Sequence, residues 1–146
     1  MIVVVDINSA EQETGAAASE EASRRLTIFS ERLLARLPAD SAGLFPAGKR
    51  LLIAQSAFEF FYTRQEPIKV RCLASGDNGV IVETVMQDCA FIVDSILEYF
   101  RANEFPVRVL LHPIYQVARD PSGAIVSFEM ASAGEQRESF THSSSA

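Results

Sequence analysis

Residues 68–86 read IKVRCLASGDNGVIVETVM, and this stretch decides the fold of the chain. Its first part alternates with a period of two, as a half-buried strand does: the apolar residues are Ile68, Val70 and Cys72, and the basic ones are Lys69 and Arg71. Asn78-Gly79 is the strongest short-range signal for a hairpin. The returning segment, residues 80–86, is apolar on both faces, which predicts a strand in the middle of a sheet.

Downstream of this hairpin, the sequence predicts a helix followed by a long strand. The helix runs from about Cys89 to Ala102, with Asp88 as its N-cap. Its inner face consists of apolar residues at spacings of three and four: Val93, Ile96, Leu97 and Phe100. Because Pro106 prevents continuation of the helix, residues 107–117 then form a long strand.

A second pair of strands completes the predicted sheet. Residues 120–123, Asp-Pro-Ser-Gly, each stand where a type I turn prefers them. Residues 107–117 are therefore followed by a return strand at 124–130. A last short strand runs through Phe140, whereas the polar end at 142–146 shows no pattern that assigns it.

Two helices and an acidic tail are predicted ahead of the hairpin. Residues 1–22 are expected to be a mobile tail, since residues 7–22 contain Ser, Ala, Gln and Glu but no basic residue. Helical order begins near Ser23 and ends at Pro38, with one apolar stripe: Leu26, Phe29, Leu33 and Leu37. A second helix spans residues 50–63, and its predicted buried face holds Leu51, Ala54, Phe58, Phe61 and Tyr62. We interpret its clustered aromatic residues as core rather than as a cofactor site.

The predicted order is helix, helix, strand, strand, helix, strand, strand, which is an α+β arrangement. Without its first helix it is a ferredoxin-like antiparallel sheet in circularly shifted order, helix-strand-strand-helix-strand-strand. In that fold the return strand 124–130 inserts between two parallel partners, 80–86 and 107–117. The strand 107–117 then lies at an edge, where Pro113 is tolerated. Three helices cover one face of such a sheet but not both, so we expect apolar surface for self-association as a dimer, with the edge at 107–111 as a second route.

Length, charge and cysteine usage exclude several classes of partner. A chain of 146 residues is the size of one ordinary domain. The net charge of -6 argues against a nucleic-acid partner, which needs clustered Lys and Arg, and against an anionic membrane surface. No apolar run approaches the roughly 18 residues of a membrane span. Cys72 and Cys89 have neither metal-ligand nor redox-motif spacing, so reduced thiols and a cytoplasmic location are expected.

The residue pattern offers no catalytic or metal centre. Nucleophilic catalysis needs a nucleophile, a base and an orienting group close together, and the histidines are His112 and His142 alone. We interpret His112 as a surface residue of an edge strand. Asp94 and Glu98 form either an acidic contact surface or a solvated helix face, with Glu98 near Arg101. We therefore expect no catalytic residue, no metal and no cofactor in this segment itself.

Several short motifs keep the mutual spacing of one known family. They are residues 83–95 (ETVMQDCAFIVDS), His112-Pro113, the turn at 119–123 and residues 138–142 (ESFTH). In these motifs the chain, over residues 24–142, resembles the N-terminal part of the large bacterial NAD-specific glutamate dehydrogenases. It departs from the family pattern at Gln87, where the family usually has an acidic residue, and at Cys89-Ala90, where it usually has Met-Pro.

The resemblance implies a non-catalytic, ACT-like regulatory domain at residues 23–146 of a much longer chain. The parent enzyme of that family oxidatively deaminates L-glutamate to 2-oxoglutarate with NAD, in a catalytic domain far downstream. ACT-like modules commonly bind amino acids or mediate subunit contacts, so a homo-oligomer, the downstream domains and an amino-acid effector are the implied partners. The sequence contains no G-x-G-x-x-G fingerprint, which is consistent with an NAD site in the downstream part.

The turn Gln87-Asp88-Cys89-Ala90-Phe91 is the one place with a physical case for recognition. It joins a central strand to a helix N-terminus, where free backbone N–H groups and the positive end of the helix dipole attract an anion such as an amino-acid carboxylate. As N-cap, Asp88 competes for the same donors. Cys89 is interpreted as a small buried residue at the helix start. The alternative to ligand binding is a purely structural or assembly role.

Overall fold

The computed structural model describes residues 16–41, 45–75, 79–130 and 136–145 as an α+β unit with a six-stranded antiparallel sheet. Residues 1–15 of the tail predicted at 1–22 and the hairpin tip at 76–78 lie outside the described residues. The helices are α1 (Ala16–Leu34), the short 3₁₀ helix η2 (Ala47–Lys49), α2 (Arg50–Tyr62) and α3 (Ile92–Ala102). The strands are β1 (Ile68–Ser75), β2 (Gly79–Gln87), β3 (Val107–Leu111), β4 (Ile114–Arg119), β5 (Ile125–Met130) and β6 (Arg137–Ser145). Within the described part of the chain, no helix is long and apolar enough to cross a membrane.

The strands follow the order β1-β2-β6-β4-β5, and β3 also pairs with β6. β1 and β2 form the predicted antiparallel hairpin, with Ile68 opposite Met86. Because β2 and β3 both run antiparallel to β6, they are parallel to each other with one strand inserted between them. That inserted strand is β6 and not residues 124–130, so this part of the prediction was wrong. The turn at 120–123 returns the chain to the outer side of β4, where β5 forms the far edge of the sheet.

The long strand predicted at 107–117 is divided into β3 and β4 by His112-Pro113. Proline has no N–H to donate to a ladder, but the carbonyl of Pro113 accepts a hydrogen bond from the N–H of Phe140 at 3.1 Å. The predicted edge position was also wrong for the second half of this strand, since β4 lies between β6 and β5. The proline is tolerated at a break between strands and not at an edge.

The central strand β6 is polar in sequence and buried in the structure. It reads RESFTHSSS, and every residue from Glu138 to Ser145 is buried. The prediction of a short strand through Phe140 with an unassigned end at 142–146 was therefore wrong for residues 142–145. Strands on both sides of β6 satisfy its backbone, and small serine side chains fit between the packed layers. A buried position is thus specified here by pairing and not by hydrophobicity.

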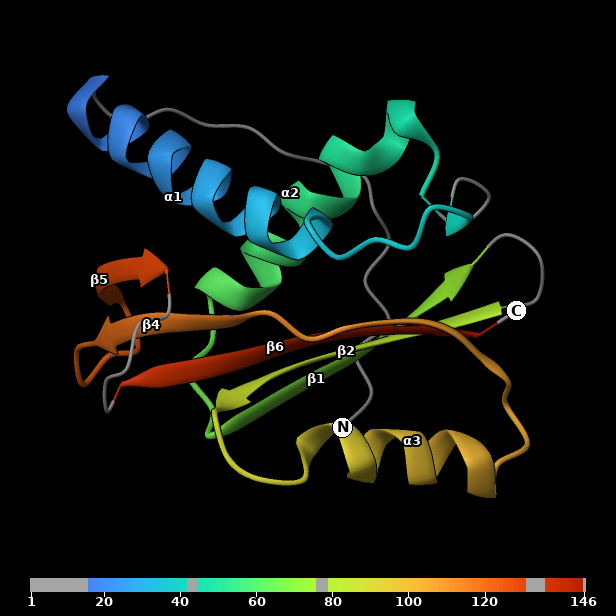
Figure 1. Ribbon diagram of the computed structural model, residues 1–146. Coiled ribbons are helices and arrows are strands. Elements are labelled where there is room, and N and C mark those ends of the chain that lie inside the picture. The colour runs from blue at the N-terminus through green and yellow to red at the C-terminus, as the bar shows by residue number, and fades with distance from the viewer. Residues whose placement is uncertain (1–15, 42–44, 76–78, 131–135, 146) are drawn as a thin grey trace.

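Helices lie on both faces of the sheet: α1 and α2 cover one face and α3 covers part of the other (Figure 1). The expectation that all three would share one face was wrong. The core between α1, α2 and the sheet is aromatic and includes Phe29, Phe61, Tyr115, Phe128 and Phe140. Phe29 stacks on Tyr115 with ring centroids 5.0 Å apart, and the Tyr115 hydroxyl donates to the carbonyl of Phe29 at 2.8 Å. This cluster joins α1 to the centre of the sheet.

The two N-terminal helices differ in detail from their predicted extents and faces. α1 begins at Ala16 and ends at Leu34, so residues 16–22 of the predicted tail are helical. On α2, Ala54 and Phe61 are buried as predicted, but Leu51 and Tyr62 are 59% and 37% exposed. Phe60 is buried instead, together with Ala57. The cations of Lys69 and Arg71 on β1 lie over the Phe60 ring, at 4.7 and 4.6 Å from its centroid. These cation–π contacts hold this part of α2 against β1.

A buried ion cluster ties the end of α2 to the sheet. The carboxylate of Glu138 on β6 accepts from Arg119 at 2.8 and 3.0 Å and from Arg64 at 2.9 and 3.1 Å. Arg119 also donates to the carbonyls of Phe61 and Tyr62 at 2.8 and 3.1 Å, where the last turn of α2 leaves carbonyls without helical partners. The cluster therefore fixes the end of a helix and the middle of the sheet at the same point.

Candidate functional site

The turn at residues 87–91 lies between the end of β2 and the start of α3. The predicted helix start at Cys89 was wrong, because α3 begins at Ile92 with Phe91 as its N-cap. Phe91 has a φ of 68°, in the left-handed region, and no side chain caps the helix. Its ring is 74% exposed. A large apolar side chain in a left-handed conformation at the surface is costly by itself, which makes Phe91 the most unusual residue of the turn.

Asp88 does not cap α3, because both its backbone N–H and its carboxylate form hydrogen bonds with residues of β6. Its N–H donates to the carbonyl of Arg137 at 2.9 Å and so extends the β2–β6 ladder. Its carboxylate accepts from Arg137 at 2.8 Å and from the Ser139 hydroxyl at 2.6 Å. The predicted competition between Asp88 and a bound carboxylate for the same backbone donors was therefore wrong. The charge of Asp88 is instead balanced by Arg137.

The Ser139 hydroxyl joins the turn to His112, at the break between β3 and β4. Ser139 has one proton, which it gives to Asp88, so it accepts a hydrogen bond from His112 Nε2 at 3.0 Å. His112 is half-buried rather than the surface residue that was predicted. Burial lowers the pKa of its imidazole, an effect that Asp88 partly opposes. This arrangement favours a neutral imidazole with its proton on Nε2.

Gln87, Cys89 and Ala90 complete the turn, and all three are exposed. The interpretation of Cys89 as a buried residue was wrong; its thiol is free and exposed. The backbone N–H groups of Cys89, Ala90 and Phe91 donate to no other described residue. Gln87 is the last residue of β2, and the next four residues connect it to α3. Three neighbouring N–H groups of this connection are thus without a partner among the described residues.

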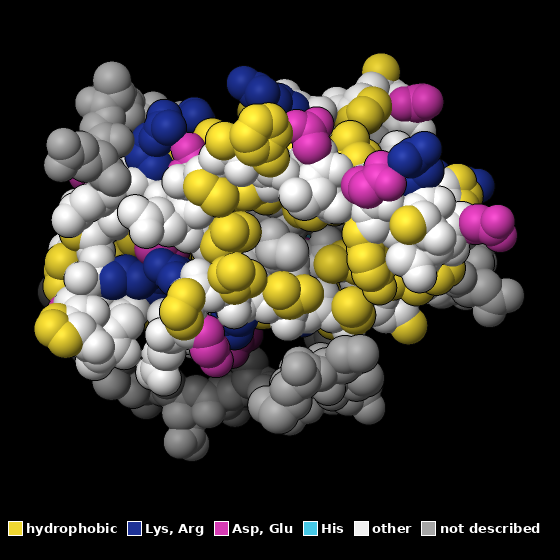
Figure 2. All heavy atoms as spheres, turned by 90° about the horizontal axis from the view of Figure 1, so that it is seen from below, with side chains coloured by type: hydrophobic (Ala, Val, Ile, Leu, Met, Phe, Trp, Pro, Cys, Tyr) yellow, Lys and Arg dark blue, Asp and Glu magenta, His cyan; other side chains and the backbone are white. Residues whose placement is uncertain are grey.

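A shallow apolar groove of about 170 Å³ runs beside the turn, between α3 and the strands β1 and β2. Ile68 and Met86 line it from β1 and β2, while Phe91 and Ile96 line it from the turn and α3. Hydrophobic side chains gather across this face of the molecule (Figure 2). The exposed ones include Ile68 (56%), Val70 (48%), Phe91 (74%), Leu97 (40%) and Tyr99 (58%). Donors for a carboxylate and apolar surface for a side chain or a partner therefore lie next to each other.

A second polar cluster, which the sequence analysis did not single out, is buried under α2 on the opposite face. Glu83 accepts from His142 Nδ1 at 2.8 Å and from Arg71 at 2.5 Å, and Arg71 also reaches Ser56 at 3.0 Å. His142 is 1% exposed, with Phe45 5.2 Å away between ring centroids. A substrate cannot reach this pair as it stands, so its geometry is that of a structural ion cluster. The placement of Arg71 opposite Glu83 in the predicted hairpin was the signal that could have found it.

The remaining predicted polar residues lie on the solvent side of α3. Glu98 and Arg101 form an ion pair at 2.8 Å with side chains 63% and 79% exposed, as expected for a solvated helix face. Asp94 is exposed on the first turn of the same helix. In the part of the chain that the structure describes, no three His, Cys, Asp or Glu residues are grouped so that they could hold a metal ion.

Comparison with known protein families gives a match. The family model described as "Glutamate dehydrogenase, ACT1 domain" matches residues 29–145, from the middle of α1 to the end of β6. No curated protein and no solved structure matches the chain. The matched range includes the turn at 87–91, the groove and both buried ion clusters.

Proposed function

The chain belongs to the ACT1 domain family of glutamate dehydrogenase, and on that premise we propose that it is a regulatory and assembly domain of an NAD-dependent enzyme. The family membership itself implies that this segment is a non-catalytic domain. In this proposal the parent enzyme oxidatively deaminates L-glutamate to 2-oxoglutarate in the cytoplasm. NAD is held by a catalytic domain downstream, and neither nucleic acid nor a membrane is a partner.

The observation that carries the assembly role is the exposed apolar face beside α3. Phe91 and Ile68 are each more than half exposed and line one groove, and Tyr99 of α3 is exposed to a similar extent. Contiguous apolar surface of this kind marks contact sites for other protein surfaces. β1 is also an edge of the sheet with one described partner, β2, so its outer side offers unpaired backbone groups. We propose that a second copy of the chain or a downstream domain covers this face.

An amino-acid effector fits the same region. The open N–H groups of Cys89, Ala90 and Phe91 can donate to a carboxylate, and the groove beside them can hold a small apolar side chain. The charge of Asp88 opposes such a ligand less than predicted, because Arg137 neutralises it at 2.8 Å. The groove is shallow, so we expect modest affinity. A purely structural oligomerisation or interdomain-contact module without a ligand is the alternative.

Phe91→Asn tests the assembly role with little risk to the fold. Asparagine adopts the left-handed conformation more readily than phenylalanine, so the variant keeps the turn while it removes the most exposed ring. We expect weaker self-association in sedimentation equilibrium, with unchanged secondary structure. Leu51→Gln is the matched control, since Leu51 is also a large exposed apolar side chain, 59% exposed, but lies on α2 on the other face.

Two results decide between the alternatives. A chain that stays monomeric at high concentration would leave only a downstream domain as the partner of this face. A dimer whose stability is unchanged by Phe91→Asn would contradict self-association through it. A panel of amino acids titrated by calorimetry tests the effector. Absence of heat across the panel, together with a dimer that Phe91→Asn weakens, supports the structural module without a ligand.

A further inference from the structure

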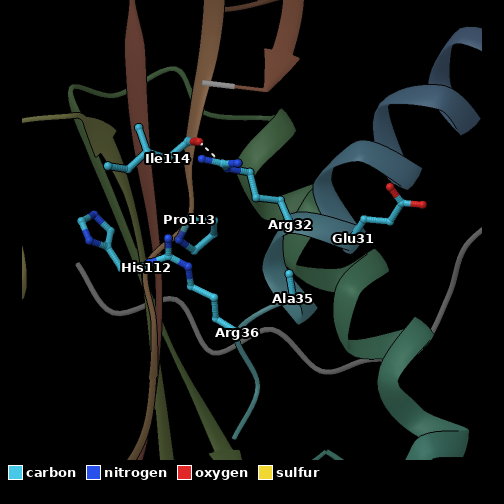
Figure 3. Close-up of a pocket in the computed structure, with 7 residues that line it drawn as sticks. All are labelled: Glu31, Arg32, Ala35, Arg36, His112, Pro113 and Ile114. Atoms are coloured by element: carbon cyan, nitrogen blue, oxygen red, sulfur yellow. Dashed lines mark hydrogen bonds between the residues drawn. The ribbon is translucent and has the colours of Figure 1, made fainter. Parts of the chain in front are cut away.

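A second hollow lies on the α1 side of the sheet, away from the turn at 87–91. It has a volume of about 310 Å³ and lies between the C-terminal half of α1 and the break that separates β3 from β4. Arg32 lies in the last turn of α1 and Arg36 lies two residues beyond its end, and both side chains reach toward this break (Figure 3). Pro113 and Ile114 form the opposite wall. The hollow therefore combines two cations with an apolar surface.

Most of the hydrogen-bond donors on these two guanidinium groups are open toward the hollow. Arg32 uses Nε to donate to the carbonyl of Ile114 at 2.9 Å, which fixes its plane and leaves its two terminal nitrogens without a partner among the described residues. Arg36 makes no hydrogen bond or ion pair with the described residues. A guanidinium carries five N–H donors in a rigid fork that matches a carboxylate. The pair can thus offer one fork each to two carboxylates.

The charge around the hollow is positive on balance. Glu31 is its acidic lining residue, and its carboxylate points away from both guanidinium groups (Figure 3). His112 contributes its backbone, because its imidazole also points away in this view and bonds Ser139. The C-terminal end of α1 attracts cations by its dipole, and this attraction explains the position of the arginines but not the open space in front of them.

We propose that this hollow binds a small dicarboxylate. One carboxylate pairs with Arg32 and the other with Arg36, whose side chains line the same hollow. A spacer of two or three methylene groups then connects the two carboxylates and packs against Pro113 and Ala35. The site is distinct from the amino-acid site at 87–91, so either can fail without the other.

The test is a titration of the whole 146-residue chain with succinate, followed by 2-oxoglutarate, at low salt by NMR or calorimetry. Butyrate has the same length as succinate but one carboxylate, and we expect it to bind at least about tenfold more weakly. Arg36→Gln should weaken succinate by a similar factor without loss of thermal stability, since Arg36 has no described partner to lose. Arg101→Gln, on the solvent side of α3, is the charge-matched control and should leave binding unchanged. Glu31→Gln should tighten it.

Several results would overturn the proposal. Equal affinities for succinate and butyrate would show that the second guanidinium is not used. Binding that survives Arg36→Gln, or falls equally in Arg101→Gln, would place the anion elsewhere or reduce it to general charge attraction. If no dicarboxylate binds and Arg36→Gln instead lowers self-association, the arginines receive a carboxylate from another protein surface and not a small molecule.

Discussion

The buried carboxylate of Glu138 offers a sharp test of how the domain is held together. Glu138→Gln keeps the size of the side chain but removes its charge and turns one acceptor into a donor. Arg119 and Arg64 then face each other across a side chain that is 5% exposed, while their own side chains are 8% and 14% exposed. Water cannot easily replace the lost counter-charge at that depth.

The expected loss of unfolding free energy follows from this burial. Removal of one partner from a buried ion pair costs about 3–5 kcal/mol. Both guanidinium groups keep hydrogen bonds to backbone carbonyls, Arg119 to Phe61 and Arg64 to Glu66 at 2.8 Å each. We therefore expect a loss near the lower end, about 3 kcal/mol. For a domain of this size that lowers Tm by roughly 10 °C.

Urea unfolding followed by far-ultraviolet circular dichroism measures this loss directly. The chain has no tryptophan, so backbone signal is preferable to fluorescence. Glu98→Gln is the matched control, because it breaks the exposed pair with Arg101 and should change the free energy by less than about 0.5 kcal/mol. A Glu138→Gln protein within about 1 kcal/mol of the parent chain, which is the error of such a comparison, with an unchanged m-value, would refute the assignment of this cluster as a structural anchor.

Two further predictions concern the core and the pH dependence. Tyr115→Phe removes the hydroxyl that donates to the carbonyl of Phe29 at 2.8 Å, and should cost about 1 kcal/mol of unfolding free energy while the ring stack remains; an unchanged Tm would contradict the value given to this bond. Burial lowers the folded-state pKa of His112 below its ordinary value of 6.5. As pH falls from about 7 toward 5, His112 is therefore protonated in the unfolded chain before it is protonated in the folded one, and the free energy of unfolding decreases. The difference in unfolding free energy between the parent chain and His112→Gln should therefore shrink or reverse over that range, whereas a constant difference would contradict it.

The sequence predicted local structure well where the deciding contacts are local. The alternation in residues 68–72 and the Asn78-Gly79 signal predicted the hairpin of β1 and β2, and spacing predicted α2 and the C-terminal part of α3. The start of α3 was wrong for a non-local reason. Asp88 has the side chain of an N-cap, but Arg137 and Ser139 capture it from a strand 49 and 51 residues further along the chain.

For the candidate site too, local features could be predicted from the sequence and long-range contacts could not. Its five residues were chosen from the sequence because a strand leads into a helix there, and the structure does have β2 end at Gln87 and α3 begin at Ile92. The left-handed Phe91 and the link from Asp88 through Ser139 to His112 could not be read locally. β6 was misjudged because hydrophobicity was used as the signal for burial, and serines in a fully paired strand carry no such signal.

The position of β6 has a consequence for how the domain is made. β6 is the last strand of the sheet in chain order, yet among the described residues its pairings alone connect the β1–β2 hairpin with β3 and with the β4–β5 hairpin. A nascent chain emerging from the ribosome can form each hairpin early, but the sheet stays divided until residues 137–145 have been synthesised. Such late, long-range closure slows folding and leaves edges of β2 and β4 exposed in the meantime. In that divided state the aromatic core is still open along the line that β6 later fills.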